Sequence, residues 1–147
     1  MEEVLAYKVR VDKDPNDVEA LEAMGNANVS LRRFDHATVW YERALKVDPN
    51  RHATRTNLAL ALRVLGKSDE AIAELKRVLA KDPKNADAVY NLGVILLEDK
   101  KDEQGAVARW EALIRAHPDD PRTPQLRQVV KTIRQPSSSP PAPPPGG

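Results

Sequence analysis

The chain lacks cysteine altogether, has few aromatic residues, and contains no long apolar run. Without cysteine, disulfide cross-links and thiolate sites are excluded. Aromatic residues make up only 4% of the 147 residues, and runs of β-branched residues are scarce, so helix is favoured over sheet. No apolar stretch approaches the roughly 18 residues that a membrane span needs.

The chain also lacks an excess of charge of either sign, because 23 basic residues face 22 acidic ones and the net charge is +1. It therefore has no large field to attract nucleic acid or an anionic membrane. The opening stretch, MEEVLAYKVR, carries two acids and lacks the basic-then-apolar order of a secretory signal. We expect a soluble protein, cytoplasmic as written, or periplasmic if an upstream segment is missing.

Patterns that carry chemistry are absent from the sequence. There is no glycine-rich phosphate loop, nucleophile elbow or His-Glu metal motif. The three histidines, His36, His52 and His117, fall at predicted turns, where a solvated surface role is favoured over a metal cluster. We therefore expect a protein that is not an enzyme, with no catalytic residue, metal, cofactor or small-molecule substrate.

A repeat marked by proline runs through the chain. Pro15, Pro49, Pro83 and Pro118 follow one another at spacings of 34, 34 and 35 residues, which is typical of stacked supersecondary units. Apolar residues recur at three- and four-residue spacing on both sides of a turn within each unit, and this pattern predicts two helices per unit. Proline ends the second helix because it disfavours helical backbone in the residue before it.

Small residues recur at two equivalent places in these units. The first helices carry Gly25, Ala59 and Gly93, and the second helices carry Ala37, Ala71 and Ala106. We expect the two sets to face each other where the helices cross, because only small side chains permit a close approach. A large residue follows each alanine by four positions and is expected to fill the adjacent space: Tyr41, Leu75 and Trp110.

The three units resemble the tetratricopeptide repeat (TPR). The resemblance lies in the segments LEAMGNAN, RTNLALAL and VYNLGVIL, and in the alanine, the large residue and the proline that follow each of them. Arg55 departs from the pattern, which has a Trp-like residue there. The resemblance implies an all-α protein, a right-handed α-solenoid of helix-turn-helix units with a C-terminal capping helix. The predicted divisions are a second helix of an incomplete repeat at 1–14, repeats at 18–51, 52–85 and 86–120, a capping helix at 122–134, and a disordered Pro-rich tail at 135–147.

The first helices of such units line one concave groove. The predicted groove residues are Glu22, Asn26, Val29, Thr56, Asn57, Leu60, Arg63, Tyr90, Asn91, Val94 and Leu97. Asn57 and Asn91 occupy the same place in successive units, and an amide can both donate to and accept from a peptide backbone. Similar family members use asparagines here to hold extended peptides, although both amides could instead bond within the scaffold.

Some family members clamp the terminal carboxylates of heat-shock chaperones with basic residues. Glu22 and Asp87 stand here where such residues are expected, and an acid disfavours a neighbouring carboxylate. We therefore predict that acidic chaperone tails do not bind, and that Arg63 with the aliphatic surface suits a partly apolar peptide or partner helix. The phrase ARWEALIRAHPDD, residues 108–120, is similar to a helix in bacterial assembly factors for c-type cytochromes, but it is too short to assign that role.

The two ends of the chain raise separate questions. A helix predicted at 2–13 carries an apolar stripe formed by Val4, Tyr7 and Val11. Three interpretations stay open: the helix caps the first unit, an upstream segment that would pack on it is missing, or the stripe pairs with a second copy of the chain. In the last predicted helix the face that should cover the third unit consists of Leu126, Val129, Val130 and Ile133. Its basic residues lack interleaved aromatics, which disfavours nucleic-acid binding.

From these observations we expect a non-enzymatic adaptor that binds a protein or peptide in its concave groove. The alternative is a scaffold that oligomerises through the incomplete N-terminal repeat. The Pro-rich tail is interpreted as a linker, with a ligand for a proline-reading partner as the other interpretation. The sequence does not identify the partner.

Overall fold

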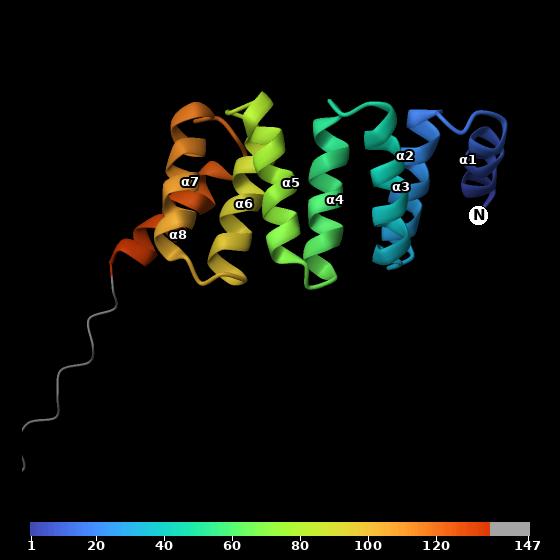
Figure 1. Cartoon of the computed structure of the whole chain (residues 1–147). Helices are drawn as coiled ribbons and strands as arrows, with labels where there is room; N and C mark the ends of the chain where they lie inside the picture. The colour runs from blue at the N-terminus through green and yellow to red at the C-terminus, as the bar shows by residue number, and fades with distance from the viewer. Residues whose placement is uncertain (136–147) are drawn as a thin grey trace, which may run out of the picture.

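The computed structural model describes residues 1–135, and within that part the chain folds into eight α-helices and no strand. The helices follow one another across the molecule in chain order (Figure 1). None of these eight helices has the length and apolar character needed to cross a membrane. Their bounds are α1 Glu2–Lys13, α2 Val18–Ser30, α3 Phe34–Val47, α4 His52–Val64, α5 Ser68–Lys81, α6 Ala86–Glu98, α7 Glu103–Ala116 and α8 Thr123–Arg134.

Three helical hairpins, α2–α3, α4–α5 and α6–α7, form the body of the molecule. Each hairpin packs on the next, through α3 against α4 and α5 against α6, and α4 also contacts α6. At the two ends α1 packs on α2, and α8 packs on α7. This arrangement confirms the predicted all-α solenoid of repeated hairpins.

The helix ends follow the local sequence. Asp17, Asn85 and Asp102 cap the starts of α2, α6 and α7, and the side chain of each accepts a hydrogen bond from a backbone N–H in the first turn. At the other end α3, α5 and α7 stop one residue before Asp-Pro or His-Pro steps, at residues 48–49, 82–83 and 117–118. Proline therefore sets the period of the fold by ending every second helix.

The helix crossings differ from the expectation in one detail. A Cβ atom added at Gly25 would meet the ring of Tyr41, and one at Gly93 would meet the ring of Trp110. The atoms nearest to the missing side chain of each glycine therefore belong to the large residue of the opposing helix, four positions after the alanine. An aromatic ring lies against bare backbone at these two crossings, so a side chain in place of the glycine would require the ring to move.

The terminal helices each contribute one apolar face to the core. In α8, Leu126 and Val130 are buried, and Val129 and Ile133 pack on the same cluster as Trp110. The face predicted for this helix is therefore confirmed. Of the predicted Pro-rich tail, residues 136–147 lie outside the described part of the chain.

Candidate functional site

A hollow of about 310 Å³ lies between the first two hairpins, on the side formed by α2 and α4. Much of its wall is aliphatic, from Val29 on α2 and from Leu60 and Val64 on α4. Leu60 is 37% exposed and Val64 is 56% exposed, so apolar surface is available to a ligand. The sequence predicted Leu60 and Val29 for this surface but missed Val64 and also Phe34, which starts α3.

Asn57 also lines this hollow and is half-buried. Its side-chain amide forms no hydrogen bond with any group in residues 1–135, and no buried polar side-chain atom there lacks a partner. The amide of Asn57 is therefore open to solvent or to a ligand.

The other asparagines of the predicted groove already have partners. Asn91 donates from Nδ2 to the carbonyl of Asp87, one turn earlier, at 2.9 Å. Asn26 accepts from the hydroxyl of Tyr41 at 2.7 Å. Burial, with a smaller contribution from the Glu22 carboxylate, raises the pKa of Tyr41 to about 12, so this hydroxyl stays a donor at neutral pH.

Glu22 ties the first hairpin to the second. Its carboxylate accepts hydrogen bonds from Thr54 and from the guanidinium of Arg51, the latter at 3.1 Å. Because these partners lie about 30 residues further along the chain, the contact forms only when α2 and α4 are stacked. The negative charge at this end of the groove is balanced by Arg51.

Arg63 ties the second hairpin to the third. Its guanidinium donates two hydrogen bonds of 2.9 Å to the carboxylate of Asp99 and also contacts Glu98. Asp99 accepts a further bond from Ser68 at 2.7 Å. Arg63, followed by Ser68, lowers the pKa of Asp99, so the carboxylate stays charged. The cation predicted for the groove is thus held by two acids of the same chain.

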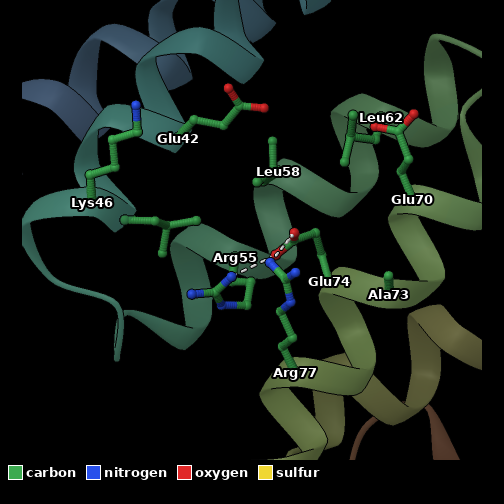
Figure 2. A pocket seen from close by; sticks show the side chains of 10 residues that line it. Glu42, Lys46, Arg55, Leu58, Leu62, Glu70, Ala73, Glu74 and Arg77 are labelled. Carbon is green, nitrogen blue, oxygen red and sulfur yellow. Dashed lines mark hydrogen bonds and ion pairs between the residues drawn. The ribbon is translucent and has the colours of Figure 1, made fainter.

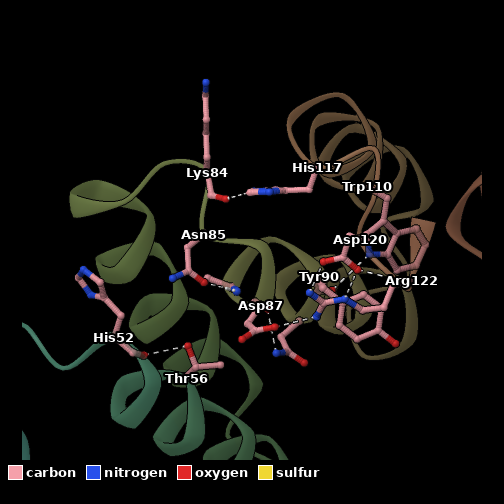
Figure 3. Close-up of polar contacts among 12 residues, drawn as sticks. His52, Thr56, Lys84, Asn85, Asp87, Tyr90, Trp110, His117, Asp120 and Arg122 are labelled. Atoms are coloured by element: carbon pink, nitrogen blue, oxygen red, sulfur yellow. Dashed lines mark hydrogen bonds and ion pairs between the residues drawn. The ribbon is translucent and has the colours of Figure 1, made fainter.

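In the third hairpin Tyr90 is part of a network around Arg122 (Figure 3). The guanidinium of Arg122 lies 4.9 Å from the centre of the Tyr90 ring and pairs with Asp87 and Asp120. The indole N–H of Trp110 donates to the carbonyl of Tyr90 at 3.3 Å. At this end of the groove Arg122, just before α8, and Trp110 of α7 are therefore in contact with residues of α6. Val94 and Leu97 of α6 are only partly exposed.

Thr56, which was predicted to line the groove, has a buried side chain and does not line the hollow between α2 and α4. Its side chain is buried at 6% exposure, and its hydroxyl donates to the carbonyl of His52 at 3.0 Å, as Figure 3 shows. Because its hydroxyl is buried and already donates to the helix backbone, Thr56 offers a ligand less than Asn57, the next residue of α4. Leu58 and Leu62, on the same helix, share this burial.

The stripe predicted for self-association is used within the chain. Val11 is buried at 5% exposure in a cluster with Leu21 and Met24 of α2, and Val4 and Tyr7 pack against the same cluster. A partner could reach Val11 only after α1 had left α2. These three residues cap the first hairpin.

A second hollow, of about 500 Å³, opens between α3, α4 and α5 around a nearly buried ion pair (Figure 2). The guanidinium of Arg55 lies 2.6 Å from the carboxylate of Glu74, and their side chains are 12% and 14% exposed. Arg55 also donates to the carbonyl of Pro49, and Glu74 accepts a second cation, Arg77. The charges of Arg55, Glu74 and Arg77 are thus paired with one another, and Leu58 contributes to the aliphatic floor of the hollow.

One family model matches residues 2–123, and its description is cytochrome c-type biogenesis protein H TPR domain. Among curated proteins the chain is similar to the protein CTR9 homolog of Arabidopsis thaliana, with 34% identity over 94 residues, 63% of this chain and 9% of that protein. It is also similar to the small glutamine-rich tetratricopeptide repeat-containing protein 2 of Mycosarcoma maydis, with 29% identity over 109 residues, 74% of this chain and 31% of that protein. The chain thus spans less than a third of either relative.

Solved structures share the fold at low sequence identity. The crystal structure of the MamA protein matches with a TM-score of 0.75 and 24% identity, over 89% of this chain and 71% of that one. The first TPR of Spaghetti (RPAP3), bound to the HSP90 peptide SRMEEVD, matches with a TM-score of 0.70 and 21% identity, over 83% of this chain and 97% of that one. These likenesses show the solenoid fold.

Proposed function

Because the chain belongs to the family of the cytochrome c-type biogenesis protein H TPR domain, we propose that it is a protein-interaction module that serves c-type cytochrome biogenesis. It binds a partner polypeptide in the groove formed by the first helices. The observation that carries this proposal is the hollow between α2 and α4, where exposed aliphatic side chains lie beside the amide of Asn57, which has no hydrogen-bond partner in residues 1–135.

This hollow suits an apolar side chain that is attached to a hydrogen-bonding backbone. Val29, Leu60 and Val64 provide the apolar contacts. The Asn57 amide can donate to a peptide carbonyl and accept from a peptide N–H. The apolar contacts contribute most of the affinity, because burying one large aliphatic side chain stabilises a complex by about 1.5–3 kcal/mol, against roughly 1 kcal/mol for a neutral hydrogen bond.

The charges of the groove oppose an acidic ligand. Its cations, Arg51, Arg63 and Arg122, are each paired with a carboxylate of the same chain. A ligand carboxylate would have to displace an acid that is already in place, which brings little net gain. The acidic peptide SRMEEVD, which is bound in the related RPAP3 structure, is therefore a predicted non-ligand for this chain.

The test is calorimetric titration with synthetic peptides that tile a c-type cytochrome, with SRMEEVD as the negative control. For a peptide that binds, Leu60→Asp should lower affinity at least about 30-fold, because a charge would be buried in the apolar hollow. Asn57→Ala should lower affinity about 5-fold, the equivalent of one hydrogen bond.

The matched control is Val39→Asp. Val39 is 54% exposed on α3 and does not line the hollow, so the variant should bind like the wild type. The proposal fails if Leu60→Asp and Asn57→Ala both bind the peptides with wild-type affinity. It also fails if amide shifts on titration fall on α5 and α7 alone.

A further inference from the structure

Helix α1 carries a second apolar stripe, which is exposed and lies outside the apolar cluster that α1 forms with α2. Leu5 is 66% exposed and Val9 is 44% exposed, and the two lie one turn apart. Val11, which is buried against α2, lies on the opposite side of the helix, because two residues correspond to about 200° of rotation. Ala6 lies between the exposed pair and is itself exposed.

The charges on this stripe are ordered along the helix. Glu2 lies at its N-terminal end and Lys13 at its C-terminal end, and both side chains are on the outward side. Neither side chain forms an ion pair with any group in the described residues 1–135, whereas the neighbouring Lys8 and Asp12 pair with each other. The outer face of α1 is thus acidic at one end, apolar in the middle and basic at the other end.

We propose that this face of α1 binds the same face of a second copy of the chain, with the two helices antiparallel. In that arrangement Glu2 of one copy lies opposite Lys13 of the other, and two-fold symmetry forms this ion pair twice. Ala6 lies opposite Val9, which lets the helices approach closely, and Leu5 covers the edge of the contact. A parallel pairing would instead bring Glu2 against Glu2 and Lys13 against Lys13.

The opposite end of the solenoid does not offer an equivalent partner. The outward residues of α8 are all polar and exposed: Gln125, Arg127, Gln128, Lys131 and Thr132. Stacking α1 of one copy on α8 of the next would bury Leu5 and Val9 against groups that need water. A closed dimer through α1 is therefore favoured over an open chain of copies.

A hollow beside α1 extends the same surface. It measures about 720 Å³ and lies between α1 and α2, and its lining includes Leu5, Ala23, Ala27 and Leu31. Leu31 is 60% exposed, so the apolar area continues from α1 onto α2. Side chains at the edge of the second copy's helix would enter this hollow. The contact remains small for a protein interface, and we therefore expect a weak dimer.

The inference is independent of the proposed groove, because it uses neither Asn57 nor Leu60. The experiment is sedimentation equilibrium of the whole chain at concentrations from about 10 µM to about 1 mM. The weight-average mass should rise from that of one chain toward that of two. Leu5→Glu combined with Val9→Glu should remain monomeric throughout, while Val39→Glu, the matched control on α3, should behave like the wild type.

Charge exchange tests the antiparallel register. Glu2→Lys and Lys13→Glu alone should each weaken dimerisation about 5-fold or more, since each puts like charges opposite one another. The double variant should return to within about 2-fold of the wild type, and an equal mixture of the two single variants should also dimerise. The proposal is overturned by a monomer at 1 mM, by dimerisation of the Leu5/Val9 variant, or by a double exchange that is as weak as the single ones. Circular dichroism verifies that each variant keeps its helices.

Discussion

The middle hairpin of this solenoid is built differently from the hairpins on either side of it. In the outer two, a glycine lies under an aromatic ring, Gly25 under Tyr41 and Gly93 under Trp110. The middle hairpin has Ala59 at the same position, with Leu75 as the large residue, and both are fully buried. One repeat thus accepts two solutions at its crossing, a bare backbone under a broad ring or a methyl group beside a branched side chain.

The difference extends to the outer surface of the hairpins. The middle hairpin carries Arg55 and Glu74 as a nearly buried ion pair beside a hollow of about 500 Å³. The equivalent residues are Leu21 and Trp40 in the first hairpin and Val89 and Arg109 in the third. Because each repeat contacts only its neighbours, the middle unit can hold a polar contact at these positions while its own core and the cores of the adjoining units remain apolar.

The largest effect is expected from removing half of the buried pair. Glu74→Ala leaves the guanidinium of Arg55 without a carboxylate at 12% exposure, and we expect a loss of about 2–4 kcal/mol in the free energy of unfolding. Arg55→Ala should cost less, because Glu74 keeps its contact with Arg77. Urea unfolding followed by circular dichroism measures both changes.

The double variant Arg55→Leu with Glu74→Leu tests whether the pair stabilises the hairpin at all. Apolar replacement of both partners makes these positions resemble Leu21 and Trp40 of the first hairpin, and we expect stability within about 1 kcal/mol of the wild type. A double variant that is as unstable as Glu74→Ala would show that the charges themselves are required. Arg77→Ala, at the exposed side of the cluster, is the control and should change stability by less than about 0.5 kcal/mol.

A smaller effect is expected when an outer crossing is converted to the middle type. Gly25→Ala places a methyl group against the Tyr41 ring and should destabilise the chain by about 1–3 kcal/mol, despite the higher helix propensity of alanine. Adding Tyr41→Leu creates the combination found at Ala59 and Leu75. In that background Gly25→Ala should no longer destabilise, and a double-mutant cycle measures the coupling.

The reverse change is the matched comparison for this cycle. Ala59→Gly in the middle hairpin removes a buried methyl group, and it should cost about 1–2 kcal/mol through helix propensity and the lost apolar burial. If Gly25→Ala costs the same with Tyr41 and with Leu at position 41, the ring does not set the requirement for glycine.

The smallest effect concerns the ion pair between Asp120 and Arg122, which lies in the segment that joins α7 to α8. Hydrogen bonds from Arg122 lower the pKa of Asp120 to about 2, below the usual value near 4. The stability that this pair contributes is therefore complete above about pH 4 and is lost as the pH falls from about 4 to about 2. Asp120→Asn should remove that part of the acid dependence, by less than about 1 kcal/mol, in thermal unfolding measured across pH 2–6. Unchanged acid dependence in the variant would exclude Asp120 as its source.

Much of the fold could be predicted from the sequence because its causes are local. Proline spacing, small residues at fixed places and three-to-four periodicity each act within one hairpin, so they indicated the solenoid and the apolar face of α8. The groove was less predictable, because contacts between hairpins decide which of its charged groups are free. Glu22 meets Thr54 and Arg51, and Arg63 meets Asp99, across 29 to 36 positions in the chain. No local pattern indicates such pairs.

By itself the sequence determined that this protein is an all-α array of hairpins with a period near 34 residues, since each signal depends on neighbours along one helix or across one turn. Only the tertiary structure decided which side chains remain open at the surface. Packing of the helices buried Thr56, paired Asn26 with Tyr41 and Arg63 with Asp99, and left the amide of Asn57 without a hydrogen-bond partner in residues 1–135. Sequence alone does not show these outcomes, because they depend on residues of other helices. It also decided which stripe of α1 faces inward, since that depends on the shape of α2 and not on the apolar residues of α1 alone.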